Sequence, residues 1–470
     1  MITSRSFVLR TQEPKGNKVF TTFHALFLLL FCLGVLLLAP SLEAQDSPST
    51  QDVTASAGSG VSSAETAGIN ESSSRIDALF APQTLGLNIH STSALPGEME
   101  MMAASGVRWI RTDLDWASTE QSKGIYDFSA YDRLMATLNP YGIRALLILD
   151  YANPLYDNGL SPYDDVGRKA FAEWARAAVC HFAGRGILWE MYNEPDLTWT
   201  PKPNAEDYAK LALTVGQALH AAASNEIYVG PALSYLMKFS FLETSLKAGL
   251  LQYWTAVSVH PYRQTPPETV ESDYTTLHAL IAKYAPPGKQ IPIICSEWGY
   301  STVWSGFDEV KQAKFLAREW MTNLINGIPF TIWYDWRNDP ANPKDPEEAN
   351  FGIVLRPYHR GRIPVFNPKP AYFAATTVNS FLDGYNFVKR IEVGSKNDFV
   401  LLFKKDGSTA ERRFRLAAWT EDADHPVVIP VERGTYSDLS YLGKSLPPLT
   451  ADSRGLTITL VDAPQYLAPE

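Results

Sequence analysis

The stretch GRKAFAEWARAAVCHFAGRGILWEMYNEP, residues 167–195, joins two different patterns in one segment. In its first part apolar residues recur every three or four positions, which predicts an amphipathic helix. After Gly186 a short apolar run ends in Asn193, Glu194 and Pro195, which predicts a buried strand followed by a turn. A helix that leads into a buried strand is the repeating step of a parallel α/β protein.

The same step recurs along the chain. Amphipathic pieces at 131–142, 205–224 and 308–328 separate short apolar runs, and residues 369–384 supply a last helix. Eight strands that alternate with helices predict an α/β protein with a (β/α)8 TIM barrel over residues 79–385. An open doubly wound sheet is disfavoured because no glycine-rich phosphate turn follows the first run. The eight runs are LGLNIH (85–90), VRWIRTDLDW (107–116), RALLILDY (144–151), ILWEMYNEP (187–195), EIYVGPAL (226–233), AVSVHPY (256–262), IPIICSEWGY (291–300) and PFTIWYDW (329–336).

The two ends of the chain differ from this core. Basic residues precede the apolar run ALFLLLFCLGVLLLA and small residues follow it, so residues 1–44 predict a signal peptide. An uncleaved membrane anchor stays open because a span needs about 20 residues. Either predicts an exported protein, periplasmic or extracellular. Residues 45–78 are rich in Ser, Thr and Ala and predict a flexible linker. Residues 386–470 hold short strand patterns and predict a small, β-sandwich-like antiparallel domain that covers the barrel or binds sugar.

Composition narrows the classes of partner. The formal net charge is −10, and no long Lys/Arg run follows the N-terminal segment, which argues against nucleic acid. Membrane contact is expected only through the possible anchor, and we expect a monomer. The eight His form neither His-x-His nor His-Glu-x-x-His, so we predict no metal and no cofactor.

Polar residues follow the apolar runs where the strands are expected to end. A barrel carries its active site at the C-terminal ends of its strands, so these side chains should share one mouth. Glu194 and Glu297 end the fourth and seventh runs and should face each other across it. A single strand-end Glu is ordinarily a salt-bridge partner or a rim charge, but a facing pair suits cleavage of an acetal. The others are Arg111, Asp113, Asp150, Tyr151, Asn193, His260, Tyr262, Trp298, Trp333, Asp335 and Trp336.

These motifs resemble those of glycoside hydrolase clan A, the retaining β-glycosidases built on a (β/α)8 barrel. The resemblance rests on NEP at 193–195 and SEWG at 296–299, and covers roughly residues 85–384. The stretches VRWIRTDLDW, GIYDFSAYDRLM and SVHPY are most similar to family 39, and next to family 5. The resemblance implies an exported retaining β-glycosidase with a polysaccharide or oligosaccharide substrate, endo-acting, in polysaccharide degradation or exopolysaccharide processing.

The resemblance also implies roles for single residues. Glu194 matches the general acid/base, and Glu297 matches the nucleophile. Arg111 and Tyr262 match the groups that orient the nucleophile. The remaining matches are Asn193, which grips the sugar 2-hydroxyl, His260, which lines the site, and Trp333 or Trp336 as the floor under the cleaved sugar. We also include Trp298, which follows the nucleophile directly, among the substrate-binding residues.

Several readings stay open. His90 either touches substrate or is buried and hydrogen-bonded. Asp150 either belongs to a sugar subsite or forms a bridge with Arg144. Glu190 is expected deeper in the barrel, bound to Arg108 or Arg111. Two rival functions use the same frame: a non-catalytic carbohydrate-binding barrel, and a transglycosylase in which a sugar replaces water.

Overall fold

The computed structural model describes residues 80, 84–197, 202–234, 238–342, 346–405 and 413–470. The expected signal peptide or anchor at 1–44 and the linker at 45–78 lie outside these residues and stay predictions. In the described ranges, no helix combines the length and apolar character needed to cross a bilayer.

Eight parallel strands close into a barrel, as predicted. Each strand pairs with the next, and the first pairs with the last, where Leu85 lies opposite Thr331. The strands are short because each runs only once along the barrel wall, after which the chain leaves the sheet and forms a helix. They are β1 (Leu85–Asn88), β2 (Trp109–Asp115), β3 (Arg144–Asp150), β4 (Leu188–Met191), β5 (Ile227–Leu233), β6 (Ala256–Val259), β7 (Ile293–Trp298) and β8 (Thr331–Trp333).

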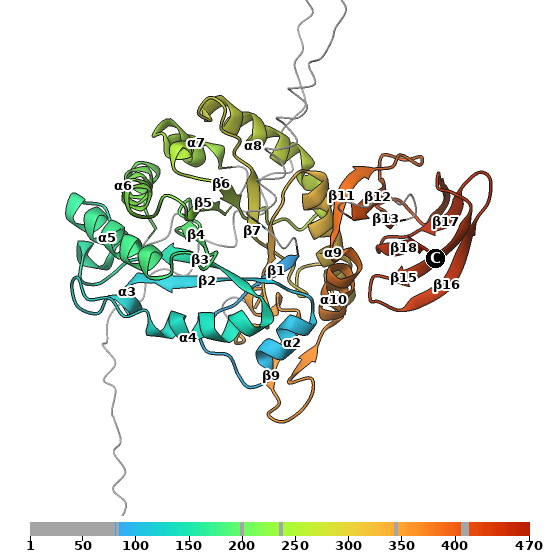
Figure 1. Ribbon diagram of the computed structural model, residues 1–470, viewed down its shortest axis with the longest axis horizontal. Helices are drawn as coiled ribbons and strands as arrows, with labels where there is room; N and C mark the ends of the chain where they lie inside the picture. Colours follow the sequence, from blue (N-terminus) through green and yellow to red (C-terminus); the bar gives the residue numbers. More distant parts are fainter. Residues whose placement is uncertain (1–79, 81–83, 198–201, 235–237, 343–345, 406–412) are drawn as a thin grey trace, which may run out of the picture. The chain divides into compact units, whose positions relative to one another are not determined.

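Helices surround these strands (Figure 1). The helix that opens the quoted stretch, Asp165–His181, starts where the Asp164 carboxylate accepts a hydrogen bond from the Gly167 N–H at 2.7 Å, and it buries Phe171 and Trp174. The helices are α2 (Glu98–Ala104), α3 (Trp116–Thr119), α4 (Ser129–Leu138), α5 (Asp165–His181), α6 (Ala205–Ala223), α7 (Phe239–Lys247), α8 (Glu271–Tyr284), α9 (Glu309–Ile325) and α10 (Pro370–Leu382).

The barrel interior is filled by apolar side chains below the mouth. Trp109, Leu188 and Ile332 belong to one buried interior cluster. Strand alternation sends every second residue inward, so the residues two positions later lie one layer higher. Arg111 and Glu190 are those residues on β2 and β4. The charged side chains of Arg111 and Glu190 therefore lie directly above this apolar cluster.

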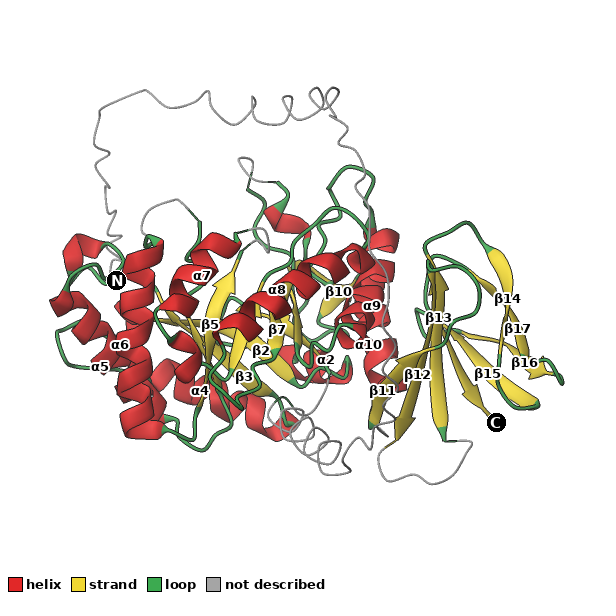
Figure 2. Ribbon diagram, turned by 90° about the horizontal axis from the view of Figure 1, so that it is seen from above, coloured by secondary structure: helices red, strands yellow, loops and turns green. Residues whose placement is uncertain are grey.

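A small antiparallel β domain follows the barrel, which also confirms that part of the predicted fold. Figure 2 shows its strands without a helix between them. The strand patterns in the sequence, FVKRIEV (387–393), DFVLLFKK (398–405), RFRLAAWT (413–420), HPVVIPV (425–431) and LTITLVDA (456–463), do not include β15, β16 and β18. β16 holds Pro447 and Pro448, which a strand tolerates at the edge of a sheet, and it is the edge strand here. The strands are β11 (Tyr385–Arg390), β12 (Asp398–Lys405), β13 (Phe414–Thr420), β14 (His425–Ile429), β15 (Gly434–Ser440), β16 (Ser445–Ala451), β17 (Leu456–Leu460) and β18 (Gln465–Pro469).

The segment between β8 and α10 forms the hairpin β9 (Val354–Tyr358) and β10 (Phe366–Pro368). The sequence pattern predicts that this insertion shapes one end of the cleft. In the loop before it, Arg337, Asp339 and Pro340 line a pocket together with residues that follow β1. Glu348, which follows this loop, is exposed and accepts a hydrogen bond from Tyr334 at 2.6 Å, as a charge at the rim of the mouth can.

Candidate active site

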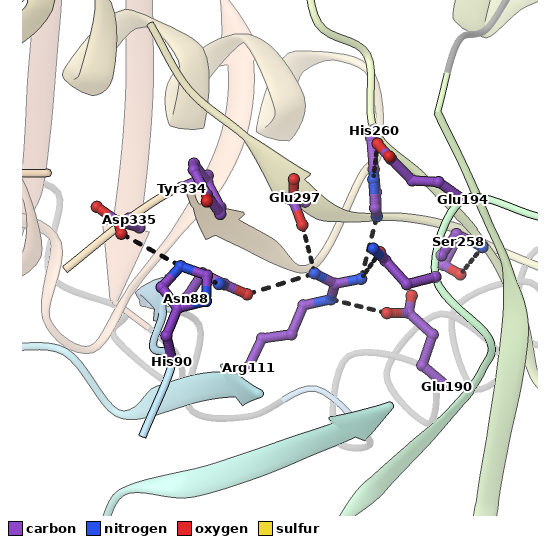
Figure 3. Close-up of polar contacts among 12 residues, drawn as sticks. Asn88, His90, Arg111, Glu190, Glu194, Ser258, His260, Glu297, Tyr334 and Asp335 are labelled. Atoms are coloured by element: carbon purple, nitrogen blue, oxygen red, sulfur yellow. Dashed lines mark hydrogen bonds and ion pairs between the residues drawn. The ribbon is translucent and has the colours of Figure 1, made fainter. Parts of the chain in front are cut away.

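Arg111 is the centre of the mouth, and its side chain is 1% exposed. Its Nε donates to Glu190 Oε2 at 2.8 Å, and Nη1 donates to Glu297 Oε2 at 2.5 Å. Nη2 donates to Asn193 Oδ1 at 2.8 Å. Burial lowers the pKa of Arg111, but the charges of Glu190 and Glu297 outweigh it and raise the pKa above its usual value. The guanidinium is therefore a fixed cation that joins three strands (Figure 3).

Glu190 lies in the interior, as expected from alternation, and its partner is Arg111. Arg108 instead donates to the backbone carbonyls of Ala103 and Val107. Glu190 is fully buried, so it cannot meet a substrate. Its charge serves to hold the guanidinium in place.

Glu297 ends β7 and points into the mouth. Its Oε2 accepts from Arg111, and its Oε1 accepts from the Tyr262 hydroxyl at 2.8 Å. The side chain is 12% exposed, so part of it remains open to a ligand. Burial and the Glu297 charge raise the pKa of Tyr262 well above its ordinary value, so the phenol stays a donor. Two donors thus give this carboxylate a set orientation.

Glu194 faces Glu297 from the end of β4. Its backbone φ of 48° lies in the left-handed region that residues other than glycine rarely adopt, and its N–H donates to the Ala232 carbonyl at 3.0 Å. Strained backbone of this kind concentrates at functional sites. Oxygen atoms of Glu194 and Glu297 lie within 4.8 Å of each other and of a His260 ring nitrogen.

His260 connects Arg111 to Glu194. Its Nε2 lies 3.3 Å from Arg111 Nη2, and its Nδ1 lies 3.0 Å from Glu194 Oε1. A guanidinium can only donate, so Nε2 must be the acceptor and the neutral ring carries its proton on Nδ1. Nδ1 therefore donates to Glu194. This chain of bonds fixes the tautomer and turns the Glu194 carboxylate toward the mouth.

Asn193 is held by both ends of its amide. Its Oδ1 accepts from Arg111, and its Nδ2 donates to the Tyr151 hydroxyl at 2.8 Å. Lys202 donates to the Asn193 carbonyl and lies over the Tyr151 ring, 4.6 Å from its centroid. Sequence reasoning did not assign Lys202, because it lies in a loop where no strand period points to it.

The structure corrects the assignment of three Trp. Trp298 and Trp333 are fully buried and Trp336 is 3% exposed. Trp298 follows Glu297, so alternation turns it away from the mouth. Trp333 donates to the Phe351 carbonyl, and Trp336 donates to Glu98. Neither of the two can be the floor under a sugar.

Tyr334 occupies the place expected for one of these Trp. Alternation from Ile332, an interior residue, turns Tyr334 inward. Its ring lies edge-on to His90 with centroids 5.5 Å apart, and its hydroxyl donates to Glu348. In Figure 3 it lies between Asp335 and Glu297. The two-residue period from Ile332 was the signal that could have identified it.

Asp150 is the second correction. It is fully buried and lies against Asp113 of β2, and neither of its oxygens meets a donor among the described residues. Arg144, the proposed bridge partner, begins β3 and Asp150 ends it, about 20 Å away at ~3.3 Å per residue. Burial and the Asp113 charge raise the pKa of Asp150 well above its ordinary value. Asp150 is therefore a buried neighbour of Asp113 and not a sugar-binding group.

His90 lies half-exposed at the rim, so of its two expected roles the one at the mouth fits. Its Nε2 lies 3.4 Å from Asp335 Oδ2 and 3.8 Å from Asp339 Oδ2. Burial lowers the pKa of His90, but Asp335 and Asp339 outweigh it and raise the pKa to about 9. At neutral pH this ring is therefore an imidazolium paired with carboxylates.

Two groups of side chains have the composition of a cation site. They are His90 with Asp335 and Asp339, and Glu194 with His260 and Glu297. In the second group Nδ1 of His260 carries a proton, so it offers no lone pair to a metal there. The expectation that the protein needs no metal stays a prediction.

Comparisons with known proteins place this geometry in context. No family model matches the sequence, and no curated protein matches it. Solved structures do. A family 39 glycoside hydrolase from the gut symbiont Bacteroides cellulosilyticus WH2 is 25% identical, over 84% of this chain and 82% of that chain, with a TM-score of 0.71.

Two further structures share the fold at lower identity. A family 39 β-xylosidase from Caulobacter crescentus is 16% identical over 84% of this chain and 96% of that chain, with a TM-score of 0.59. A family 30 endoxylanase from Clostridium papyrosolvens C71 is 12% identical over 83% and 97%, with a TM-score of 0.56. The predicted resemblance to clan A enzymes is therefore confirmed, and the neighbours support the predicted enzyme class, a glycosidase.

Proposed function

We propose that this protein is an exported retaining β-glycosidase that hydrolyses O-glycosidic bonds of a polysaccharide or oligosaccharide. One observation carries the proposal: Glu194 and Glu297, from opposite arcs of the barrel, bring carboxylate oxygens within 4.8 Å. Retaining glycosidases separate their carboxyl groups by about 5–5.5 Å, whereas inverting enzymes leave about 6.5–9.5 Å for a water molecule. The short separation supports retention.

The bonds around the pair suit a double displacement. Glu297, held in place by Arg111 and Tyr262, attacks the anomeric carbon with a carboxylate oxygen. The bond from this carbon to the leaving oxygen breaks as Glu194 gives that oxygen its proton. A glycosyl ester on Glu297 results. Glu194 then takes a proton from water, the water oxygen bonds to the anomeric carbon, and Glu297 leaves as a carboxylate.

The supporting residues fit the needs of the transition state. The side-chain oxygen of Asn193 accepts from Arg111, and one of its two amide N–H groups donates to Tyr151. The second amide N–H is therefore available for a sugar hydroxyl. A hydrogen bond to the sugar 2-hydroxyl strengthens as positive charge develops on the ring. His260 donates to Glu194 and fixes the direction in which its carboxyl group points, toward the leaving oxygen in the first step and water in the second.

The proposal is tested with aryl β-glycosides of differing leaving groups. Glu297→Gln should lower kcat by several orders of magnitude because no nucleophile remains. Glu194→Gln should spare substrates with good leaving groups, which need no proton, and azide should speed its second step by replacing activated water. Glu271→Gln is the matched control. Glu271 is exposed on α8, so this variant should keep the wild-type rate.

The stereochemistry of the first product decides the mechanism. Proton NMR of the initial sugar should show the β-anomer. Release of the α-anomer, or a wild-type rate for Glu297→Gln, would contradict the proposal. Product analysis with sugar acceptors separates hydrolysis from transglycosylation, since both use the same glycosyl ester. Export is supported by the charge and hydropathy order of residues 1–44, and fractionation of the source cells tests it.

A further inference from the structure

The hairpin formed by β9 and β10 is positively charged, although the whole chain carries a formal net charge of −10. From residue 349 to residue 382 the sequence contains no Asp and no Glu. The same range contains Lys369, which is buried, and the exposed residues Arg356, Arg360 and Arg362. Other residues separate the three Arg in RPYHRGR (356–362), so the sequence shows no continuous basic run, and the hairpin gathers them on one part of the surface.

The backbone of this hairpin is held at its turn and at its base. In the turn the His359 N–H donates to the Val365 carbonyl at 2.7 Å, and the Arg362 N–H donates to the His359 carbonyl at 3.1 Å. At the base the Tyr358 hydroxyl donates to the Pro96 carbonyl, in the loop after β1, at 3.0 Å. Figure 1 shows the hairpin, next to the label β9, projecting past α2. Its tip is therefore a convex feature on a fixed support.

The exposed Arg side chains of the hairpin lack acidic partners. Within the described ranges, none of Arg356, Arg360 and Arg362 forms an ion pair with a carboxylate. Arg362 donates to the Pro364 carbonyl at 3.2 Å and to the side chain of Asn367, whereas Arg360 makes no hydrogen bond to the described residues. Positive charges without counter-ions repel one another, so this surface favours the binding of an anionic partner.

An apolar side chain lies at the tip beside these charges. Ile363 directly follows Arg362, and its side chain is 97% exposed. A single exposed Ile is ordinary on a protein surface, but this one lies at the end of a projection that also carries Arg. Apolar groups flanked by basic residues bind the interface of a bilayer, where the apolar group enters the acyl boundary and Arg binds phosphate groups. A convex tip also fits a flat surface, whereas small ligands bind in concave sites.

We propose that the tip of the β9–β10 hairpin docks on a bilayer that contains anionic phospholipid. Ile363 enters the interface, and the exposed Arg of the hairpin bind the phosphate groups of the lipids. Arg356 also lines a pocket with Asn88, the last residue of β1, so docking holds the barrel mouth beside the membrane surface. The contact is separate from residues 1–44 and is therefore expected in a chain that has lost its signal peptide. An acidic polysaccharide is the rival partner for the same Arg.

Flotation of the full-length protein with vesicles of phosphatidylcholine, with and without phosphatidylglycerol, tests the contact. The wild type should prefer the anionic vesicles, and this preference should fall as salt is raised, because exposed charges are screened. Arg360→Gln should weaken binding to the anionic vesicles about fivefold, which is the contribution of one Arg at an anionic surface. Lys169→Gln is the matched control. Lys169 is exposed on α5, so this variant also removes one charge but should bind as the wild type does. Any binding through residues 1–44 is common to both variants.

A fluorescent label at the tip reports the contact directly. Ile363→Cys, in a chain with Cys32→Ser and Cys180→Ser, carries an environment-sensitive nitrobenzoxadiazole label, and the remaining Cys295 is buried. Anionic vesicles should shift the emission to the blue and raise its intensity, as apolar surroundings do. The same label on Val166→Cys, an exposed position on α5, is the control and should not respond.

The outcomes separate the two partners. Arg360→Gln should keep the wild-type rate on soluble aryl glycosides, which shows that its fold is intact. Equal vesicle binding by Arg360→Gln and Lys169→Gln, or an unchanged label at residue 363, would overturn the proposal. A label that responds to soluble polygalacturonate and not to vesicles would assign the hairpin to an acidic polysaccharide and would also overturn the membrane contact.

Discussion

At the scale of single residues, the site is organised by one buried cation. All the N–H groups of Arg111 point at acceptors: two carboxylates, two amide oxygens and an imidazole nitrogen. Arg suits this role because its planar fork presents five donors in fixed directions. A lysine could not hold three strands at once. The orientation of the nucleophile therefore depends on a residue that never meets the anomeric carbon.

Arg111→Met should destabilise the protein by about 3–5 kcal/mol, because it leaves Glu190 buried without its partner. Adding Glu190→Gln should recover much of that loss by removing the unpaired charge. Urea unfolding measures both. Activity should stay low in the double variant, since Glu297 still lacks its Arg. Arg108→Met, which loses bonds to backbone carbonyls, is the control and should cost less. A stable, fully active Arg111→Met would contradict this account.

Asp150 and Asp113 form a buried carboxyl pair, the pKa of each is raised by burial first, and we predict that the two share one proton. The folded pKa of Asp150 is raised by burial and by Asp113, so the folded state keeps a proton that the unfolded chain loses near pH 4. Stability linked to this group is therefore full below that pH and is lost as pH rises toward the folded pKa, by up to about 1.4 kcal/mol per pH unit.

Asp150→Asn tests this pair. The amide can donate to Asp113 as the protonated acid does, so the fold should persist, and the fall in stability with rising pH should become shallower than in the wild type. Melting temperature measured from pH 4 to pH 8 gives the two slopes. If the slopes are equal, Asp150 is ionised in the folded protein and the shared proton is refuted.

At the scale of elements, the approach of β7 and β8 sets the geometry of the mouth. The pairing carries a register shift between Cys295 and Trp298, one residue longer on β7 than on β8. Such a bulge turns Glu297 toward the mouth at the strand end. Gly299 follows directly, and a Cβ there would lie 2.2 Å from the Tyr334 carbonyl oxygen. The glycine of SEWG is thus required by the close approach of two backbones.

Gly299→Ala should push β7 away from β8 and displace both Glu297 and Tyr334. We expect kcat to fall about 100-fold, as small misplacements of reacting groups can cause, with a stability loss of about 1–3 kcal/mol from overpacking. Gly394→Ala is the matched control, because its Cβ would meet Asp398 at an ordinary 3.5 Å. Unchanged kinetics in Gly299→Ala would show that the spacing of β7 and β8 does not determine the position of Glu297.

At the scale of the whole molecule, a buried ion pair links the barrel to the β domain. Arg318 of α9 makes two bonds of 2.7 Å to Glu268, a residue of the 3-10 helix Pro267–Val270. Trp419 of β13 donates to the same carboxylate at 2.7 Å. Arg318 is 3% exposed and Glu268 8%, so water offers little replacement for these bonds. The contact ties the stability of the β domain to the barrel.

Glu268→Gln should cost about 1–3 kcal/mol, because Arg318 and Trp419 lose a charged acceptor while Arg318 keeps Glu421 at 3.3 Å as its remaining carboxylate partner. Hydrogen exchange should then show β13 amides losing protection before those of β4, while kcat/KM on aryl glycosides stays at the wild-type value. Lys314→Gln is the control, because its pair with Asp462 is exposed and worth at most about 1 kcal/mol. Equal loss of protection in β13 and β4 would mean that the two parts unfold as one unit.

Much of the fold follows from local patterns that need no tertiary information. Alternation of helical and strand periods predicts the barrel, and the rule that barrel sites lie at strand ends brings Arg111, Glu194 and Glu297 to one mouth. The prediction that Trp298, Trp333 and Trp336 bind substrate was wrong, because all residues near a strand end were expected to face the mouth. Adjacent residues there point to opposite faces, and the inward one on β8 is Tyr334.

The sequence by itself determined the barrel, the β domain and the facing pair of Glu, because hydrophobic period and strand order are local properties of the chain. Tertiary structure alone decided which side chains surround that pair. Arg111 meets Glu190 and Glu297, and Asp150 meets Asp113, across strands that closure of the barrel brings together. Bulges, close backbone approach and buried charge pairs arise only after closure, so no single segment encodes them.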